Sequence, residues 1–103
     1  MEGTKGKEKR RDKRFKIEAN VEIRYLGKTF KAQTVDISKR GFGFVSPKLI
    51  SPGTKIDAVI FLKTPERVSG EVKWVIAEPD PSEGTMSYRT GVAVKGIIPL
   101  PGE

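Results

Sequence analysis

Two groups of polar residues in this chain have types and spacings that suit ligand recognition. Arg10 and Arg14 lie four residues apart near the N-terminus, and Asp36 and Ser38 alternate with apolar residues in a stretch that ends at Gly41. Guanidinium groups fork onto phosphate oxygens and onto the O6/N7 edge of guanine. A carboxylate can accept hydrogen bonds from the opposite edge of the same base. Together these residue types suit a guanine nucleotide that carries phosphates.

The residue inventory excludes most other kinds of site. The 103 residues include no cysteine and no histidine, which removes disulfides, thiol nucleophiles, the commonest general base and the commonest metal ligand. The acidic residues are scattered, and the glycine spacing is not typical of a phosphate loop followed by a helix. We therefore expect no enzyme activity, no metal site and no cofactor.

Positive charge is concentrated at the N-terminus. The net charge is +7, and residues 1–17 hold eight Lys or Arg against three Asp or Glu. A basic arm on a nearly neutral domain indicates an anionic partner, although a charged terminus by itself more often only keeps a protein in solution. No apolar run approaches the roughly 18 residues that span a bilayer, and the N-terminus lacks the apolar core of a signal peptide. These features favour a cytoplasmic protein without membrane insertion.

Six apolar or alternating segments predict strands, and no segment is a convincing helix. The expected strands cover residues 19–26, 29–38, 42–46, 55–62, 67–77 and 86–94, with an acidic loop over residues 78–85. Short strands at regular spacing are typical of an antiparallel barrel or sandwich, and closure into a barrel hides the strand edges. The predicted fold class is all-β, a six-stranded antiparallel β-barrel.

The strand over residues 29–38 changes its alternation part-way. Its apolar residues fall on opposite faces in the two halves, with Phe30 and Ala32 in the first and Val35 and Ile37 in the second. A bulge near residues 33–34 would reconcile the halves. It would dock the second apolar pair on the core and turn Asp36 and Ser38 outward together, with Gly41 as a left-handed turn residue that ends the strand.

Several aromatic residues are interpreted as core residues, namely Phe42, Phe44 and Phe61. The strand over residues 55–62 is apolar on both faces, which predicts that both are buried. Trp74 shares its alternation with Val72, and a lone tryptophan on a strand is more often a core residue than a ligand contact.

An Arg-x-x-x-Arg element ahead of a β-barrel, followed by Asp-x-Ser-x-x-Gly, resembles the PilZ domain family. Arg10 and Arg14 match the first motif, and Asp36, Ser38 and Gly41 match the second. The resemblance covers nearly the whole chain and implies binding of the bacterial second messenger cyclic di-GMP. In that family an arginine loop, flexible when empty, closes over the ligand and takes phosphate and guanine, while the Asp/Ser pair takes a guanine edge.

The resemblance also implies a division of the chain and a set of ligand contacts. Residues 1–14 would be a flexible basic arm, residues 15–95 a PilZ-like barrel of the split-barrel type, and residues 96–103 a short tail, whose prolines argue against the C-terminal helix of many members. The implied ligand-binding residues are Arg10, Arg11, Arg14, Asp36, Ser38 and Gly41, with Lys9, Arg40 and Trp74 as possible further contacts. In that family the residue before the first motif arginine, here Lys9, helps to set whether one or two ligand molecules bind. A partner protein, which the sequence does not identify, would read the signal.

Two other functions fit parts of the sequence. A small basic barrel can bind single-stranded nucleic acid, but this needs aromatic residues exposed beside a basic groove, and most aromatic residues here fall in phase with the core. A protein-interaction adaptor with a vestigial nucleotide site is the other alternative, and one binding measurement with cyclic di-GMP separates it from the first.

Overall fold

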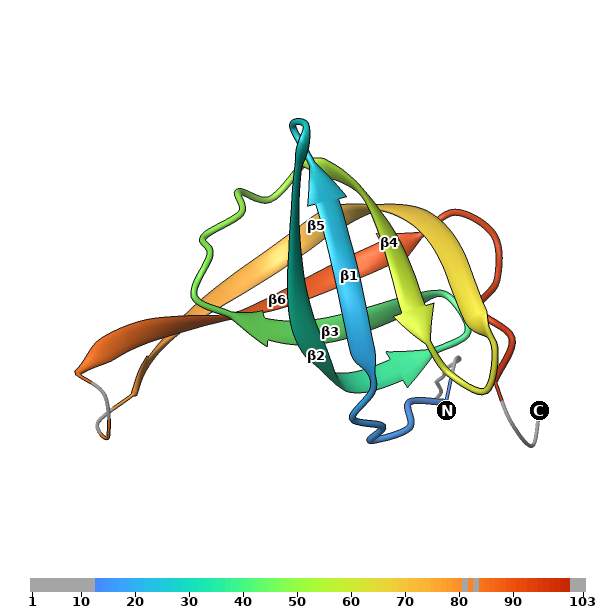
Figure 1. Cartoon of the computed structure of the whole chain (residues 1–103), viewed down its shortest axis with the longest axis horizontal. Coiled ribbons are helices and arrows are strands. Elements are labelled where there is room, and N and C mark those ends of the chain that lie inside the picture. Colours follow the sequence, from blue (N-terminus) through green and yellow to red (C-terminus); the bar gives the residue numbers. More distant parts are fainter. Residues whose placement is uncertain (1–12, 81, 83, 101–103) are drawn as a thin grey trace, which may run out of the picture.

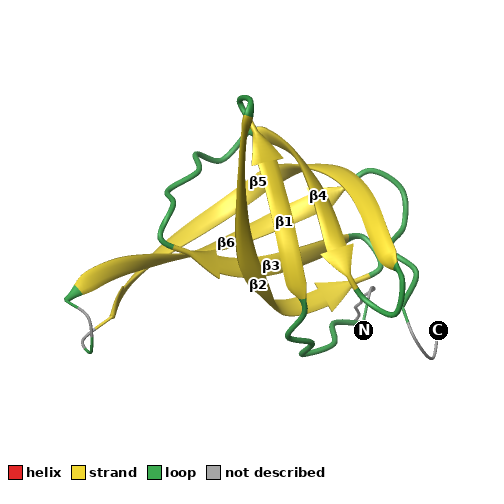
Figure 2. Cartoon of the chain, in the orientation of Figure 1, coloured by secondary structure: helices red, strands yellow, loops and turns green. Residues whose placement is uncertain are grey.

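The computed structural model describes residues 13–80, 82 and 84–100, which form a closed antiparallel β-barrel (Figure 1). Its strands are β1 (Asn20–Tyr25), β2 (Lys28–Ser38), β3 (Gly41–Ser46), β4 (Lys55–Phe61), β5 (Pro65–Asp80) and β6 (Thr85–Val94). Around the barrel they follow the order β1-β2-β3-β6-β5-β4, and β1 pairs with β4 to close it. This part of the chain contains no helix, and hence none that could span a membrane (Figure 2). The predicted six-stranded all-β barrel is confirmed.

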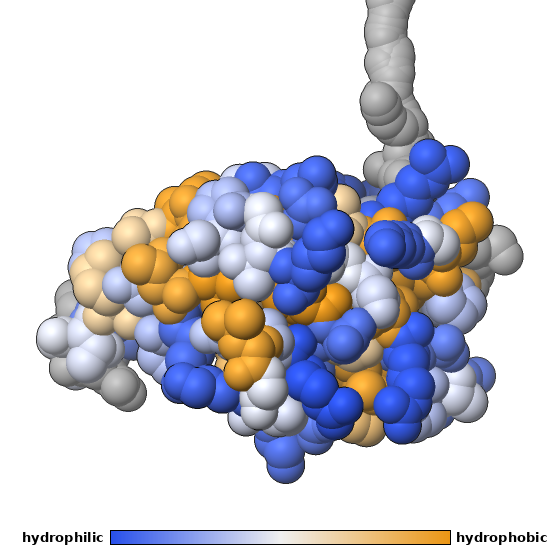
Figure 3. Space-filling model, turned by 90° about the horizontal axis from the view of Figure 1, so that it is seen from above, coloured by the Kyte–Doolittle hydropathy of each residue, from blue (hydrophilic) through white to orange (hydrophobic). Residues whose placement is uncertain are grey.

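Alternate residues of the strands fill the barrel with one apolar core. Its largest fully buried side chains include Phe42, Phe44, Ile23, Ile37 and Ile60. The outer surface meets water, and Figure 3 shows hydrophilic residues over much of one face with apolar patches between them. The barrel wall is a single layer of strands, so one face of each strand packs on the core and the other forms the outer wall.

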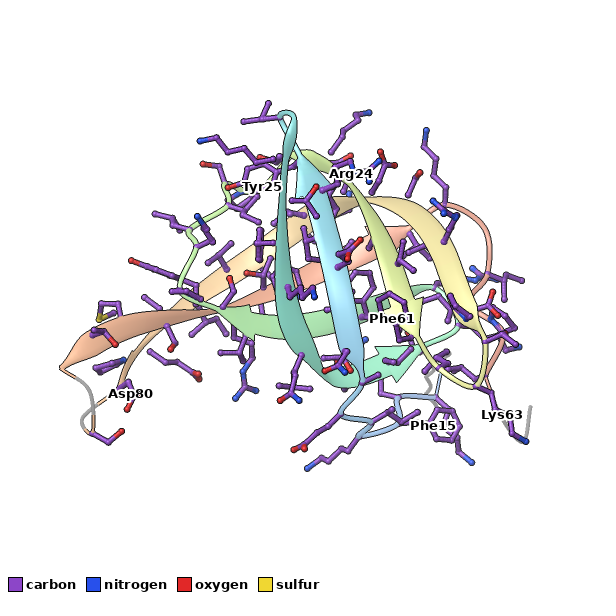
Figure 4. All side chains as sticks on the ribbon, viewed as in Figure 1. Phe15, Arg24, Tyr25, Phe61, Lys63 and Asp80 are labelled. Atoms are coloured by element: carbon purple, nitrogen blue, oxygen red, sulfur yellow. The ribbon has the colours of Figure 1, made fainter. Side chains whose placement is uncertain are left out.

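This single-layered wall overturns two predictions about β4. Ile56, Ala58 and Ile60 are buried, whereas the residues between them are exposed or half-buried. The expectation that both faces of residues 55–62 are buried is therefore wrong. Phe61, interpreted as a core residue, is 44% exposed at the end of β4 (Figure 4).

β5 and β6 continue past the barrel as a projecting hairpin, at the left of Figure 1. Their pairing runs from Gly70 opposite Val94 to Asp80 opposite Thr85. Part of the predicted acidic loop therefore belongs to strands. The apolar alternation that marks a strand is missing there because both faces of the projection meet solvent, while backbone pairing still holds the two strands together.

The C-terminal segment packs against the barrel. Ile98 is fully buried and Leu100 is 8% exposed, so residues predicted as a tail contribute to the core. The main-chain N–H of Ile98 donates to the carbonyl of Lys39 at 2.7 Å, and that of Val94 donates to the carbonyl of Arg40 at 2.9 Å. These bonds fasten the segment to the turn between β2 and β3.

Thr90 is a fully buried threonine on β6, and its hydroxyl has no hydrogen-bond partner among the described residues. Burying a hydroxyl without a partner costs about 1–3 kcal/mol, and valine has a similar shape without that group. We expect Thr90→Val to raise the free energy of unfolding by about 1 kcal/mol, measured by urea denaturation. A loss of stability would show that the hydroxyl bonds to a buried water molecule.

Candidate functional site

The outer face of four neighbouring strands carries a row of glycines between a carboxylate and an indole. Asp36 on β2 lies opposite Gly43 on β3, Gly43 lies opposite Gly91 on β6, and Gly91 lies opposite Trp74 on β5. Residues directly opposite one another point to the same face of a sheet. The carboxylate and the indole therefore stand at the two ends of this glycine row, which has no side chains of its own.

Two β-bulges turn Asp36 and Trp74 outward. The register shifts between Thr34 and Asp36 in β2, and between Val72 and Trp74 in β5. Thr34 is 1% and Val72 is 0% exposed, so strict alternation would bury the residue two positions further on in each strand. The predicted bulge in β2 is confirmed, slightly further along than expected. The interpretation of Trp74 as a core residue on the face of Val72 is wrong, because Trp74 is 40% exposed.

Arg14 pairs with Asp36 although 22 residues separate them in the sequence. The guanidinium donates two hydrogen bonds to the carboxylate, from Nη2 to Oδ1 at 3.0 Å and from Nε to Oδ2 at 3.2 Å. The two side chains are 50% and 30% exposed, and an exposed pair contributes only about 0–1 kcal/mol to stability. Its main consequence is geometric, since it holds a forked cation at the carboxylate end of the glycine row.

The residue after Arg14 is anchored to the barrel. Phe15 and Ile37 form an antiparallel bridge, in which each main-chain N–H donates to the other's carbonyl, at 2.8 and 2.9 Å. The Phe15 side chain also packs against the core. The backbone of Arg14 is therefore held close to the bulge that turns Asp36 outward.

The second half of β2 differs in part from its prediction. Ile37 is fully buried as expected, but Val35 is half-buried at the bulge and does not belong to the core. Ser38 is 2% exposed, and its hydroxyl donates to the carbonyl of Gly41 at 3.3 Å. The expected outward hydroxyl beside Asp36 is therefore wrong in this structure, because the hydroxyl closes the turn between β2 and β3.

Gly41 begins β3 and does not have the left-handed conformation that the sequence suggested. It is required for a different reason. A Cβ placed on Gly41 would lie 2.5 Å from the carbonyl oxygen of Val92 on β6. The glycine lets two backbones approach closely beneath the outer face.

An open hollow of about 730 Å³ lies over this face. Three cations and the indole surround a floor of small residues, the cations being Arg14, Arg40 and Lys73 and the floor Gly41, Gly91 and Ala93. Lys73 also pairs with Glu71 at 3.6 Å. Volumes of this size hold small-molecule ligands in other proteins. The structure thus brings Arg14, Ser38, Arg40, Gly41 and Trp74 of the predicted set to one hollow, with Asp36 beside it.

Three of the predicted contacts, Lys9, Arg10 and Arg11, lie outside the described residues, and their roles stay predictions.

Of the floor residues only Gly41 is among the predicted contacts, whereas Gly91 and Ala93 are not. Residues 41–44 read Gly-Phe-Gly-Phe, and residues 91–94 read Gly-Val-Ala-Val. Each large residue in these runs packs in or against the core, and each small one lies on the outer face. Strands that alternate small and large residues have an outer face with little side-chain cover. This pattern could have identified the floor of the hollow.

Gly91 supports the ring of Trp74. A Cβ added at Gly91 would overlap three atoms of the indole, so we expect Gly91→Ala to displace the ring. Trp74 is the one tryptophan of the chain, and its emission spectrum should shift to longer wavelength as the ring enters water. Gly43→Ala is the matched control, since its Cβ meets Asp36 and not the indole. An unchanged spectrum in Gly91→Ala would contradict the contact.

The fold and the site together define a small antiparallel barrel with an open cationic hollow on the outer face of its sheet. The family model of the PilZ domain matches residues 8–97. The chain belongs to the PilZ domain family.

Solved structures share this fold at low sequence identity. The MrkH–c-di-GMP complex of K. pneumonia matches with a TM-score of 0.68 and 18% identity, over 85% of this chain and 44% of that one. The PilZ domain of YcgR from Escherichia coli, with c-di-GMP, matches with a TM-score of 0.62 and 9% identity, over 90% and 80%. The Bacillus subtilis inhibitor of motility MotI matches with a TM-score of 0.65 and 14% identity, over 87% and 44%. This chain spans less than half of MotI and MrkH, and none of the curated proteins compared with it matches.

Proposed function

We propose that the chain binds cyclic di-GMP in the hollow on the outer face of β2, β3, β6 and β5. The observation that carries the proposal is the forked ion pair of Arg14 and Asp36 beside a hollow of ligand size. Membership of the PilZ family supports the choice of ligand, as do the MrkH and YcgR structures that contain c-di-GMP.

Each group around the hollow matches a group of this ligand. The guanidinium of Arg14 suits a phosphodiester or the O6/N7 edge of guanine, and Arg40 and Lys73 add positive charge for the second phosphodiester. The exposed face of Trp74 offers a surface on which a base can stack. Asp36 suits the N1–H and amino donors of guanine.

The pairing of Asp36 with Arg14 is compatible with this role. A carboxylate has two oxygens with about four lone-pair sites, and the two bonds from Arg14 occupy one site on each oxygen. Asp36 can therefore hold Arg14 and accept from guanine at the same time. Ser38 acts through the turn it closes, which carries Arg40.

The proposal extends to the N-terminal arm, residues 1–14. Arg10 would bind the ligand as the first arginine of the motif, with Arg11 and Lys9 as further contacts, while the arm closes over the hollow. Ordering a residue costs about 1–2 kcal/mol, and charge-assisted hydrogen bonds of about 1.5–3 kcal/mol each offset that cost. The barrel, from residue 15, would then show a partner protein a changed surface.

Isothermal titration of the purified chain with cyclic di-GMP tests the proposal. We expect saturable heat and a change in Trp74 fluorescence. The adenine analogue, cyclic di-AMP, lacks the guanine donors that suit Asp36 and should bind about tenfold more weakly or worse. If roughly tens of micromolar cyclic di-GMP gives neither heat nor amide shifts, the proposal is wrong and the adaptor alternative gains support.

Single-stranded nucleic acid is the second candidate, and the exposed indole of Trp74 beside three cations favours it. Nucleic-acid-binding barrels use several aromatic platforms along a strand, and this hollow offers one. Tight, steeply salt-dependent binding of an oligonucleotide, together with no response to cyclic di-GMP, would favour this function instead.

A further inference from the structure

Thr34 on β2 is a buried threonine, 1% exposed. It fastens residues 14–19, the segment that precedes β1, to β2. Its Oγ1 donates to the carbonyl of Ile17 at 2.6 Å and accepts from the main-chain N–H of Ala19 at 2.9 Å. Its own main-chain N–H donates to the carbonyl of Ala19 at 2.9 Å. The register of β1 and β2 ends one step earlier, at Asn20 and Gln33. The hydroxyl therefore bonds to the segment just beyond the last residue pair of the β1–β2 ladder.

The path that Thr34 fixes leads directly to Arg14. On the N-terminal side of Ala19 the segment turns tightly, and the N–H of Ile17 donates to the carbonyl of Phe15 at 2.9 Å. Residues 15–19 are one residue longer than the facing residues 34–37 of β2, and this three-residue turn accommodates the extra residue. The bridge between Phe15 and Ile37 then holds the segment again, and Arg14 is the next residue.

We propose that Thr34 is a positioning residue for Arg14 in ligand binding. It does not line the hollow, so it acts through the course of the segment, which brings the guanidinium to Asp36. The inference rests on the proposed function, because ligand affinity is the property that this positioning serves.

Thr34→Val tests the inference, because valine keeps the shape and the burial of threonine but cannot bond to the segment. We expect the affinity for cyclic di-GMP to fall about tenfold while the NMR spectrum stays dispersed, as for a folded barrel. In the ligand-free protein, the Arg14 Nε–Hε signal, which reports the hydrogen bond to Asp36, should weaken or shift. Thr34→Ser restores a hydroxyl and should recover most of the affinity and the signal.

Thr90→Val is the matched control, since it removes the hydroxyl of another fully buried threonine, on β6. It should leave the affinity and the Arg14 signal unchanged. Unchanged affinity in Thr34→Val overturns the inference. So does a fall in affinity and stability with an unaltered Arg14 signal, because that pattern shows a merely structural role. If the parent protein does not bind cyclic di-GMP, the proposed function fails, whereas the Arg14 signal still tests the positioning.

Discussion

Arg14→Ala is expected to weaken the binding of cyclic di-GMP by about 100-fold or more and to leave the barrel folded. The guanidinium already makes two hydrogen bonds in a fork geometry, which also fits phosphate and guanine. Hydrogen bonds to charged groups contribute about 1.5–3 kcal/mol each. The loss of two such bonds to the ligand therefore costs roughly 3–6 kcal/mol, which corresponds to a factor of about 10²–10⁴ in affinity. Titration calorimetry or, for weak binding, an NMR titration measures it.

Stability should be almost unaffected by the same substitution. Both partners of the ion pair are partly exposed, at 50% and 30%, and such pairs contribute about 0–1 kcal/mol to folding. Arg24→Ala is the control, because Arg24 is an exposed arginine on β1 at the other end of the barrel from Phe15 (Figure 4). If Arg14→Ala binds as well as the parent protein, or if Arg24→Ala is equally weak, the site assignment is wrong.

The bulge in β2 could be predicted because the apolar alternation differs between the two halves of this one strand. Phe30 and Ile37 are both apolar, yet an unbroken strand would place them on opposite faces. Both pack in or against the core, which requires an extra residue between them. The sequence therefore contained the signal that turns Asp36 outward.

The bulge in β5 leaves no comparable mark. Val72, Trp74 and Ile76 alternate without interruption, and they suit a strand with all three side chains buried. The position of Trp74 is instead decided across the sheet, where Gly91 leaves its backbone bare for the indole. A pattern within one strand cannot reveal a contact of this kind.

Other parts of the site depend on the completed barrel. Ser38 was expected beside Asp36 on the outer face, but the short turn to Gly41 brings a carbonyl within reach of its hydroxyl. Ile98 and Leu100 carry no periodic signal around Pro99, although both pack in the core. The motif residues and the strands could be predicted from the local sequence, whereas the hollow that they surround is formed by tertiary packing.

Gly41→Ala is expected to lower the free energy of unfolding by about 1–3 kcal/mol, the usual cost of overpacking. The added Cβ would lie 2.5 Å from the carbonyl oxygen of Val92, which is a backbone atom and cannot rotate away. β3 and β6 would have to separate at the pairing of Gly41 with Ala93, which is part of the floor of the hollow. The carbonyl that accepts from Ser38 would move as well, and we expect the affinity for cyclic di-GMP to fall about tenfold.

Gly43→Ala is the matched comparison, because it adds the same atom two residues along the same strand. Its Cβ would lie 3.0 Å from Oδ1 of Asp36, a side-chain atom that can yield by a few tenths of an ångström. Urea denaturation should therefore show a clear loss of stability for Gly41→Ala and a change within about 0.5 kcal/mol for Gly43→Ala. Equal stability of the two variants would contradict the close approach of β3 and β6. The difference follows from which atom the new methyl group meets, a rigid carbonyl in one case and a movable carboxylate in the other.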